Sequence, residues 1–333
     1  MTKSNVIART FPDLDIRNYT EKDVIKILGW IEKNNWSDST KVIYKVTLKK
    51  LLLFQKNDHL AKMVNPGRAI YKPKLPEEIL TEDEIKSMIE NADTPRNKAF
   101  ISGIYEAGAR ISEFGTLKLK HVVFDEFGIR LTVNGKTGMR IVRLIFSVPF
   151  MISWINIHPY KNDPNAPLWV TDKKAGFKPR QMEYAGFRKI VKTIAEISNI
   201  KKRVYNQLFR HTRATHLALK VSESQMKIIF GWTADSNMPK IYIHLSGVDV
   251  DDTILKLYGL KKEEETESVL TIKNCIRCKQ NIPTIGNFCP VCGMIQNTET
   301  ALQLQNFEAK AKNLMFKIIK DNPELIKILE EIQ

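Results

Sequence analysis

Cysteine is confined to one short stretch of this 333-residue sequence. All four cysteines lie between positions 275 and 292. Disulfide bonds cannot therefore hold the rest of the chain together, and we expect a reducing, cytoplasmic compartment. The sequence also lacks the apolar N-terminal run of a secretory signal, so we expect no targeting segment.

Long hydrophobic runs are also missing. The longest apolar stretch, Leu144–Ile157, is interrupted by Pro149. It is shorter than the roughly 20 residues that a membrane-spanning helix needs. We therefore expect no membrane association, and we interpret this stretch as a strand that runs into a buried helix. There is no internal repeat.

The composition points to a globular protein with an anionic partner. Hydrophobic residues make up 43% of the chain, which is enough for a sizeable core. Lysine and arginine number 52 against 37 acidic residues, which gives a net charge of +15. Such a surplus favours nucleic acid or an anionic membrane as partner. It is also found in cytosolic proteins that have no specific polyanionic partner.

Residues 1–66 have the pattern of a helical domain. Thr20 followed by Asp23 predicts a helix cap, and Ser39 predicts the cap of the next helix. Three lysines at i, i+4 spacing share a face of that second helix: Lys41, Lys45 and Lys49. They indicate either a solvated face or a surface that follows DNA phosphates.

The rest of the chain divides into five further segments. Residues 67–79 are a proline-rich linker, and 80–260 form a mainly α domain that begins with a cap at Thr81. Within it we expect helices at 94–107, 112–117, 180–197 and 207–220, and a β-hairpin at 129–148 that turns between Gly135 and Gly138. A charged linker (261–270), a cysteine-containing module (271–296) and a helical tail (297–333) follow.

Several short motifs could carry chemistry. FRHTRATHLALK, from position 209, places Arg210 at an expected helix start, where backbone N–H groups also favour an anion such as phosphate. GARISEF contains Arg110 and Glu113, and NGKTGMR places Lys136 at a hairpin tip. IYIHLS contains Tyr242, whose hydroxyl could attack phosphorus. Each motif alone also fits a structural role: a solvated arginine, a surface turn or a packed tyrosine.

The order and spacing of these motifs resembles the tyrosine recombinase/integrase family, which includes the Xer recombinases, phage integrases and Cre. The resemblance covers roughly residues 5–260 and is most specific over 103–248, and in detail the chain looks similar to archaeal integrase-like members. It implies a helical core-binding domain and an α-rich catalytic domain with a small antiparallel sheet. The implied partner is a double-stranded DNA recombination site, with a homotetramer at synapsis.

The resemblance also implies a role for each motif residue. Arg110, Arg210 and Trp232 would contact the scissile phosphate, with Glu113 and Gln207 supporting them. Lys136 would protonate the leaving 5′ oxygen, and Tyr242 would form a 3′-phosphotyrosyl bond. Rejoining would need no ATP and no catalytic metal. Two arginines and an indole N–H suit the charge that develops on the phosphoryl oxygens.

One position departs from the family pattern. The family usually has histidine three residues before the second arginine, whereas this chain has Gln207. Glutamine can hydrogen-bond to a phosphate but cannot accept a proton near neutral pH. His211 and His244 are close in sequence and either could compensate for Gln207, although packing or capping is the commoner role of a histidine such as His211.

The cysteines form two CxxC pairs separated by ten residues: Cys275, Cys278, Cys289 and Cys292. This spacing predicts one structural zinc ion in a ribbon-like module, with Pro290 and Gly293 suited to a knuckle turn. The module could bind DNA, bind another protomer or stabilise the tail.

We interpret the chain as a site-specific DNA recombinase for integration, excision or chromosome resolution. One alternative is a catalytically impaired DNA-binding regulator on the same fold, which Gln207 favours. Others are a DNA-relaxing enzyme that nicks and reseals without strand exchange, and a zinc-ribbon nucleic-acid binder on a helical scaffold.

Overall fold

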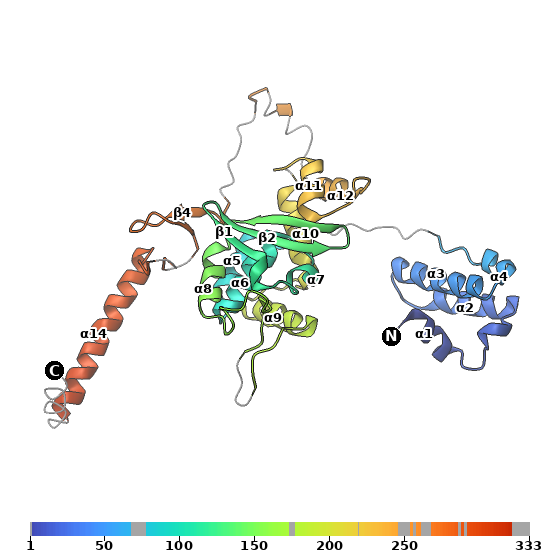
Figure 1. Cartoon of the computed structure of the whole chain (residues 1–333), viewed down its shortest axis with the longest axis horizontal. Helices are drawn as coiled ribbons and strands as arrows, with labels where there is room; N and C mark the ends of the chain where they lie inside the picture. Colours follow the sequence, from blue (N-terminus) through green and yellow to red (C-terminus); the bar gives the residue numbers. More distant parts are fainter. Residues whose placement is uncertain are drawn as a thin grey trace. The chain divides into compact units, whose positions relative to one another are not determined.

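The computed structural model describes residues 2–67, 78–172, 177–218, 220–245, 254–255, 258–260, 268–285, 288–289 and 292–321, without the side chains of 16, 244, 245 and 319–321. The chain divides into two compact units, Met1–Pro73 and Lys74–Gln333 (Figure 1). Most of the expected linkers at 67–79 and 261–270, the end of the expected tail and Pro290 lie outside the described residues.

The first unit is a small helical domain. Its elements are α1 (Lys3–Thr10), η1 (Ile16–Asn18), α2 (Glu21–Lys33), α3 (Asp38–Phe54) and α4 (Asp58–Met63). Apolar residues at helical spacing on α2 and α3 face each other and form its core: Val24, Ile27, Ile31, Tyr44, Leu48 and Leu52. The helical spacing of the apolar residues therefore explains how the helices of this unit form a common core.

One of its two predicted caps is confirmed and the other is wrong. Thr20 and Asp23 form the expected reciprocal capping box of α2. Helix α3 begins earlier than expected, because the Ser37 hydroxyl accepts the Thr40 backbone N–H at 3.3 Å. Ser37 is therefore the cap, and Ser39 lies inside the first turn.

The second unit is mainly helical, with a small antiparallel sheet, as the sequence predicts. Its main elements are α5 (Glu82–Glu90), α6 (Pro95–Ala107), α7 (Ile111–Phe114), η3 (Leu119–His121), β1 (Val122–Asp125), β2 (Gly128–Gly135), β3 (Gly138–Leu144), α8 (Val148–Asn156), α9 (Tyr184–Ile197), α10 (Asn206–Leu217), α11 (Glu223–Phe230) and α12 (Met238–Leu245). After these come β4 (Ile272–Asn274), β5 (Asn281–Pro283) and α14 (Thr298–Asp321).

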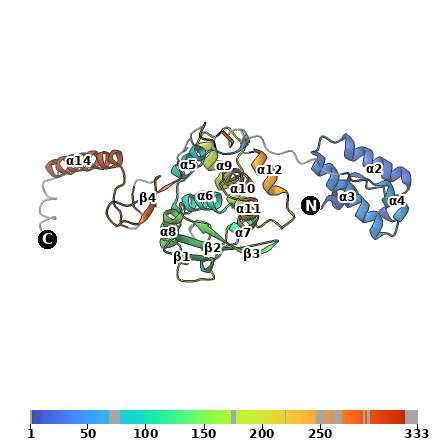
Figure 2. The ribbon, with the colours of Figure 1, turned by 90° about the horizontal axis from the view of Figure 1, so that it is seen from above.

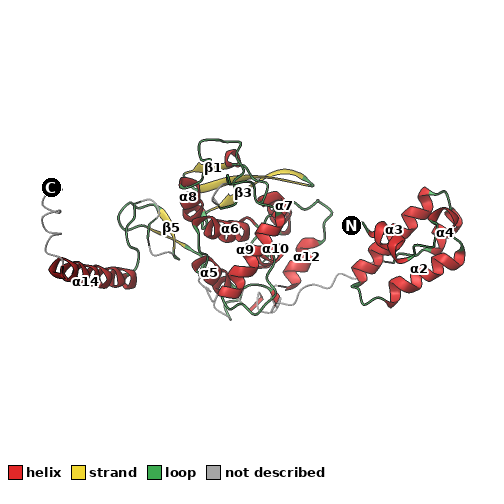
Figure 3. Ribbon diagram, turned by 90° about the horizontal axis from the view of Figure 1, so that it is seen from below, coloured by secondary structure: helices red, strands yellow, loops and turns green. Residues whose placement is uncertain are grey.

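Helix α6 lies at the centre of this unit. Nearly all of its residues are buried, and it packs against α5, α8, α10 and β3. Figures 2 and 3 show the three-stranded sheet on one side of α6 and α5 on the other. The residue after α6, Gly108, therefore leads the chain from the middle of the core to the motif that contains Arg110.

The strands pair in the order β1-β2-β3, all antiparallel. Gly135 pairs with Gly138, so Lys136 and Thr137 form a two-residue hairpin loop as predicted. Glu106 fixes the exit from β3: its carboxylate accepts the backbone N–H groups of residues 145, 146 and 147 at 2.8–2.9 Å. The strand therefore leads into α8, the buried helix expected after it.

Some helix bounds differ from expectation. The helix expected at 112–117 is the short α7, which ends at Phe114, and the one expected at 207–220 is α10, which ends at Leu217. The helix expected from 180 begins at Tyr184 instead, because Arg180 and Met182 exchange backbone hydrogen bonds with Thr171 and Trp169. An extended pairing replaces the first helical turn there.

Over the described part of the chain, every helix is too short or too polar to cross a bilayer.

Candidate functional site

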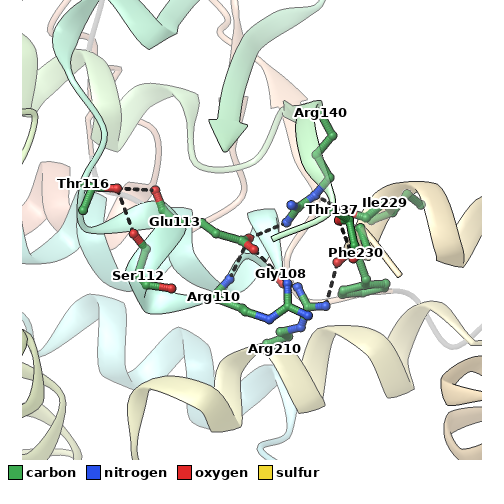
Figure 4. A network of polar contacts seen from close by, with 11 residues as sticks. Gly108, Arg110, Ser112, Glu113, Thr116, Thr137, Arg140, Arg210, Ile229 and Phe230 are labelled. Carbon is green, nitrogen blue, oxygen red and sulfur yellow. Dashed lines mark hydrogen bonds and ion pairs between the residues drawn. The ribbon is translucent and has the colours of Figure 1, made fainter. Parts of the chain in front are cut away.

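Glu113 lies at the centre of a polar network between three elements (Figure 4). Its carboxylate is 3% exposed and accepts Nη1 of Arg110 at 2.8 Å and Nη2 of Arg140 at 2.7 Å. It also accepts the backbone N–H of Arg110 at 3.2 Å, which fixes the start of α7. Burial alone would raise the pKa of Glu113, but the hydrogen bonds and charges of Arg140 and Arg110 outweigh it and lower that pKa. Glu113 is therefore an ionised anchor that orients both arginines.

Sequence reasoning did not identify Arg140. Its side chain is 8% exposed, and Nε donates to the Ile229 carbonyl at 2.9 Å. Arg140 therefore ties β3 to α7 and to the end of α11. Strand alternation places it on the inward face with Val142 and Leu144, both of which are buried. A charged residue on the buried face of a strand needs a buried acidic partner. The position of Arg140 on that face was therefore the signal by which sequence analysis could have identified it.

We expect Glu113→Gln to destabilise the second unit by about 3 kcal/mol at pH 7, because two arginines lose their carboxylate. The folded-state pKa of Glu113 is lowered, so its stabilisation is complete above the unfolded pKa of about 4.3 and is lost as the pH falls through the folded value. The difference between wild type and variant should therefore shrink below about pH 4.

Urea titrations at several pH values, followed by hydrogen exchange in α6, would measure this difference. Glu90→Gln, a change at an exposed acidic residue of α5, is the control. A destabilisation that is independent of pH would contradict the role of the Glu113 charge.

Arg210 is the most deeply buried charged group of the site. It is 2% exposed, and its guanidinium donates to the carbonyls of Gly108 at 3.0 Å and Phe230 at 2.6 Å. Its guanidinium carbon lies 5.6 Å from the centre of the Trp232 ring. Burial and, next, the charge of Arg110 lower the pKa of Arg210 to about 10, so it remains cationic at neutral pH.

The expected place of Arg210 at a helix start is wrong. Helix α10 begins at Asn206, so Arg210 is its fifth residue, and it is neither solvated nor beside the terminal N–H groups. The cation is held by carbonyl groups at the ends of two other helices, α6 and α11. The site therefore draws its positive charge from side chains and not from the α10 dipole.

Two glycines allow these carbonyls to approach. Gly108 ends α6 at φ +55°, and a Cβ there would lie 2.5 Å from the Phe230 ring. Gly231 ends α11 at φ +57°, and a Cβ there would lie 2.9 Å from the Arg140 guanidinium. Both positions combine a left-handed backbone with close contact, which only glycine accommodates.

Lys136 is exposed at the tip of the β2–β3 hairpin. The hydroxyl of its neighbour Thr137 donates to the Gly231 carbonyl at 3.1 Å. This contact, together with Arg140, holds the hairpin tip beside the end of α11. Lys136 therefore lies on a loop that is anchored to the end of α11, with its own side chain exposed.

Tyr242 lies in a small core shared by α10, α11 and α12. The side chain is 1% exposed, and its ring stacks on Trp232 with centroids 5.5 Å apart. The hydroxyl lies 2.7 Å from Nδ1 of His211. Sequence analysis weighed this histidine as a substitute for the missing base but favoured a packing or capping role, and it did not foresee the contact. The side chain of His244 lies outside the described set.

Gln207 is half-buried in the first turn of α10, one turn before His211. Of the sequence-derived residues, the structure thus brings together Arg110, Glu113, Arg210, Trp232 and Tyr242, with Lys136 on an adjacent hairpin.

Two lysines on α3 have an acidic partner within the first unit. Lys41 and Lys45 both contact Glu32, with Nζ–O distances of 3.4 and 2.6 Å. Lys49 lies one turn further along α3 and is half-buried. Two of the three lysines that are expected to contact DNA are therefore ion-paired within the first unit.

The four cysteines converge in two similar turns. The residue after each CxxC has a left-handed backbone: Lys279 at φ +61° and Gly293 at φ +73°. In each turn that residue donates its N–H to the carbonyl of the first cysteine, at 3.0 and 2.9 Å. These are paired knuckles, and their Sγ atoms all lie within 4.8 Å of one another.

A zinc ion fits this arrangement. The closest Sγ–Sγ distances are 3.6 Å, from Cys275 to Cys292 and from Cys278 to Cys289. Zn–S bonds of about 2.3 Å place tetrahedral sulfur atoms about 3.8 Å apart. All four cysteines are free thiols, and Ile285 and Leu270 beside them pack against the core of the second unit.

The fold is similar to those of solved recombinase and integrase structures. The structure resembles a lambda integrase dimer bound to a COC′ core site, with a TM-score of 0.55, 14% identity, and coverage of 74% of this chain and 87% of that one. Among curated proteins, the chain is 26% identical to the tyrosine recombinase of Thermosipho africanus over 260 residues, which is 74% of this chain and 88% of the relative. It is 30% identical to tyrosine recombinase XerA of Pyrococcus horikoshii over 122 residues, 36% of this chain and 40% of that one.

The model of the phage integrase family matches residues 78–279. The chain belongs to this family, the tyrosine recombinases. The motifs that contain Arg110, Lys136, Arg210 and Tyr242 lie inside the matched range.

Proposed function

We propose that this protein is a site-specific DNA recombinase that cuts and rejoins duplex DNA through a 3′-phosphotyrosyl bond to Tyr242. The observation that carries the proposal is the convergence of Tyr242, Trp232 and Arg210 beside the Arg110–Glu113 pair. These residues come from separate sequence motifs, and hydrophobic packing alone would not bring cationic groups together beside a tyrosine hydroxyl. Family membership and this convergence support the same activity.

Each residue has a role that suits its position. The Tyr242 oxygen forms a bond to phosphorus as the bond from phosphorus to the 5′ oxygen breaks. Arg110 and Arg210 stabilise the charge that develops on the phosphoryl oxygens, and the Trp232 indole N–H can donate to one of them. Lys136, on its hairpin loop, gives a proton to the leaving 5′ oxygen. Rejoining is the reverse attack by a 5′ hydroxyl.

The nucleophile is buried in the structure, so the site must open around Tyr242 before its hydroxyl meets a duplex phosphate. In the described part of the chain, α12 packs mainly against α10 and α11. We propose that synapsis of four protomers on two DNA sites accompanies this step. The basic first unit, with Lys41, Lys45 and Lys49, would bind the DNA flanking the cut.

Covalent trapping tests the proposed function. The protein would be incubated with nicked duplexes drawn from the DNA that flanks its own gene, and adducts would be separated on a denaturing gel. Peptide mapping by mass spectrometry should locate the nucleotide on Tyr242. An adduct on any other residue, or tight binding of all duplexes without an adduct, would contradict the proposal.

A catalytically impaired regulator is the second candidate. Gln207 favours it, because a glutamine cannot accept a proton. It predicts tight, site-specific binding to DNA without covalent chemistry, and the same trapping experiment separates the two.

The four cysteines would hold one structural zinc ion, which supplies cross-linking of the module and no chemistry at Tyr242. We expect metal analysis to find one zinc per chain, and Cys289→Ser to lose it. Because the knuckles then lack their cross-link, hydrogen exchange in β4 and β5 should rise to that of an unfolded segment.

Arg277→Ala, at an exposed position between the first two cysteines, is the matched control and should keep the metal. Full protection of β4 and β5 in metal-free Cys289→Ser would show that the module folds without zinc.

A further inference from the structure

We infer that His211 accepts the proton of Tyr242 during attack on DNA, and so supplies the basic group that Gln207 lacks. The inference rests on the proposed function. It begins from the contact between the Tyr242 hydroxyl and Nδ1 of His211, which is 2.7 Å long and joins α12 to α10. That length is typical of a strong hydrogen bond to a hydroxyl group.

The place of His211 on α10 suits this role. It lies four residues after Gln207, so both side chains occupy the same face of the helix, one turn apart. It also directly follows Arg210, whose guanidinium would contact the phosphate. A base one helical turn after position 207 can therefore act at the same phosphate if the tyrosine hydroxyl contacts it. The Tyr242 hydroxyl contacts His211 in this way.

The chemistry requires such a group. A phenol with a pKa near 10 is protonated at neutral pH, and its oxygen attacks phosphorus only as the proton leaves. With Nε2 protonated, neutral His211 presents a lone pair at Nδ1 to the hydroxyl. The phenolic proton passes to Nδ1 as the O–P bond forms, and the 5′ oxygen takes its proton from Lys136. In the reverse step the imidazolium returns its proton to the leaving phenolate.

A second tyrosine–histidine pair on the same helix shows what is particular to this one. The Tyr105 hydroxyl lies 2.9 Å from Nδ1 of His216, and Tyr105 is also buried. Burial raises the pKa of Tyr105 to about 12. The charge of Arg213 acts on Tyr105, whereas the charge of Tyr242 acts on Arg210, which lies beside Arg110 and Glu113. The Tyr105–His216 pair is therefore a structural equivalent outside the reaction site.

His211→Asn is the informative variant, because the asparagine amide can still hydrogen-bond at the place of Nδ1 but is not basic. The probe is the nicked duplex on which the wild-type protein forms its adduct, and single-turnover adduct formation is the measured rate. We expect a loss of about 10²–10⁴-fold. Adding Gln207→His to the variant should restore at least tenfold, which a packing role of His211 would not allow. His216→Asn is the control and should stay within threefold of wild type.

The outcomes separate the two proposals. If wild type forms an adduct and His211→Asn stays within threefold of it, this inference is wrong and the proposed function stands. A large loss that Gln207→His does not restore, with unchanged hydrogen exchange in α10 and α12, also overturns it. Should His211→Asn fail to fold, His211→Gln replaces it under the same criteria. The absence of any wild-type adduct would overturn both.

Discussion

Tyr242→Phe is expected to bind its DNA site with wild-type affinity and to form no covalent adduct with it. The substitution removes one oxygen, the proposed nucleophile, and leaves the ring that stacks on Trp232. The hydrogen bond to His211 is lost, so the free energy of unfolding should fall by about 1 kcal/mol. Gel-shift titration would measure binding, and denaturing gels would measure the adduct.

Tyr105→Phe is the matched control for this change. It also removes a buried hydroxyl that bonds to a histidine of α10, and it should cost similar stability while the adduct persists. If Tyr242→Phe still formed an adduct, another residue would be the nucleophile. If both variants lost the adduct, the effect of Tyr242→Phe would be one of folding and not of chemistry.

Arg210→Lys should lower the rate of DNA cleavage by about 10²–10³-fold, because a lysine lacks the second donor group that stabilises the phosphoryl oxygens. A single ammonium also cannot span the carbonyls of Gly108 and Phe230, which now share one guanidinium. Leaving one buried carbonyl unpaired should cost about 1–3 kcal/mol. Single-turnover cleavage and urea unfolding would measure the two effects.

Arg96→Lys separates these effects. Arg96 is 6% exposed and donates to the Val170 carbonyl and the Asn97 side chain, both at 3.0 Å. Its replacement should destabilise the second unit without slowing cleavage of the folded protein. Equal cleavage by the two variants would show that Arg210 serves only the fold.

The parts of the fold that sequence could predict are those set by local chemistry. The Thr20 and Thr81 capping boxes and the Gly135–Gly138 turn each depend on residues a few positions apart, and all are present. Paired CxxC spacing similarly predicted the cysteine cluster. Such signals are encoded within one turn of helix or one hairpin, so they can be read without knowledge of the tertiary structure.

What could not be predicted depends on contacts between distant segments. The partners of Arg210 are backbone carbonyls about 20 and 100 positions away. Every residue has a backbone carbonyl, so the residue types do not show which carbonyls will accept these hydrogen bonds. In the sequence, Arg140 has the pattern of an ordinary hairpin residue, and its role becomes visible only from its contact with Glu113 in the folded structure. The His211–Tyr242 contact likewise requires α10 and α12 to lie side by side. The apolar periodicity of each helix shows which face is buried but not which other helix it packs against.

The grouping around Glu113 has a consequence for charge balance. The guanidinium groups of Arg110, Arg140 and Arg210 act on one another, and one carboxylate offsets them, which leaves two surplus positive charges. A phosphodiester carries one negative charge, whereas the five-coordinate phosphorus passed through during transfer carries two. In the proposed reaction, two negative charges match the surplus fully only in the transition state. Relief of the repulsion that Arg110 and Arg140 exert on Arg210 would therefore favour the transition state over bound, uncut DNA.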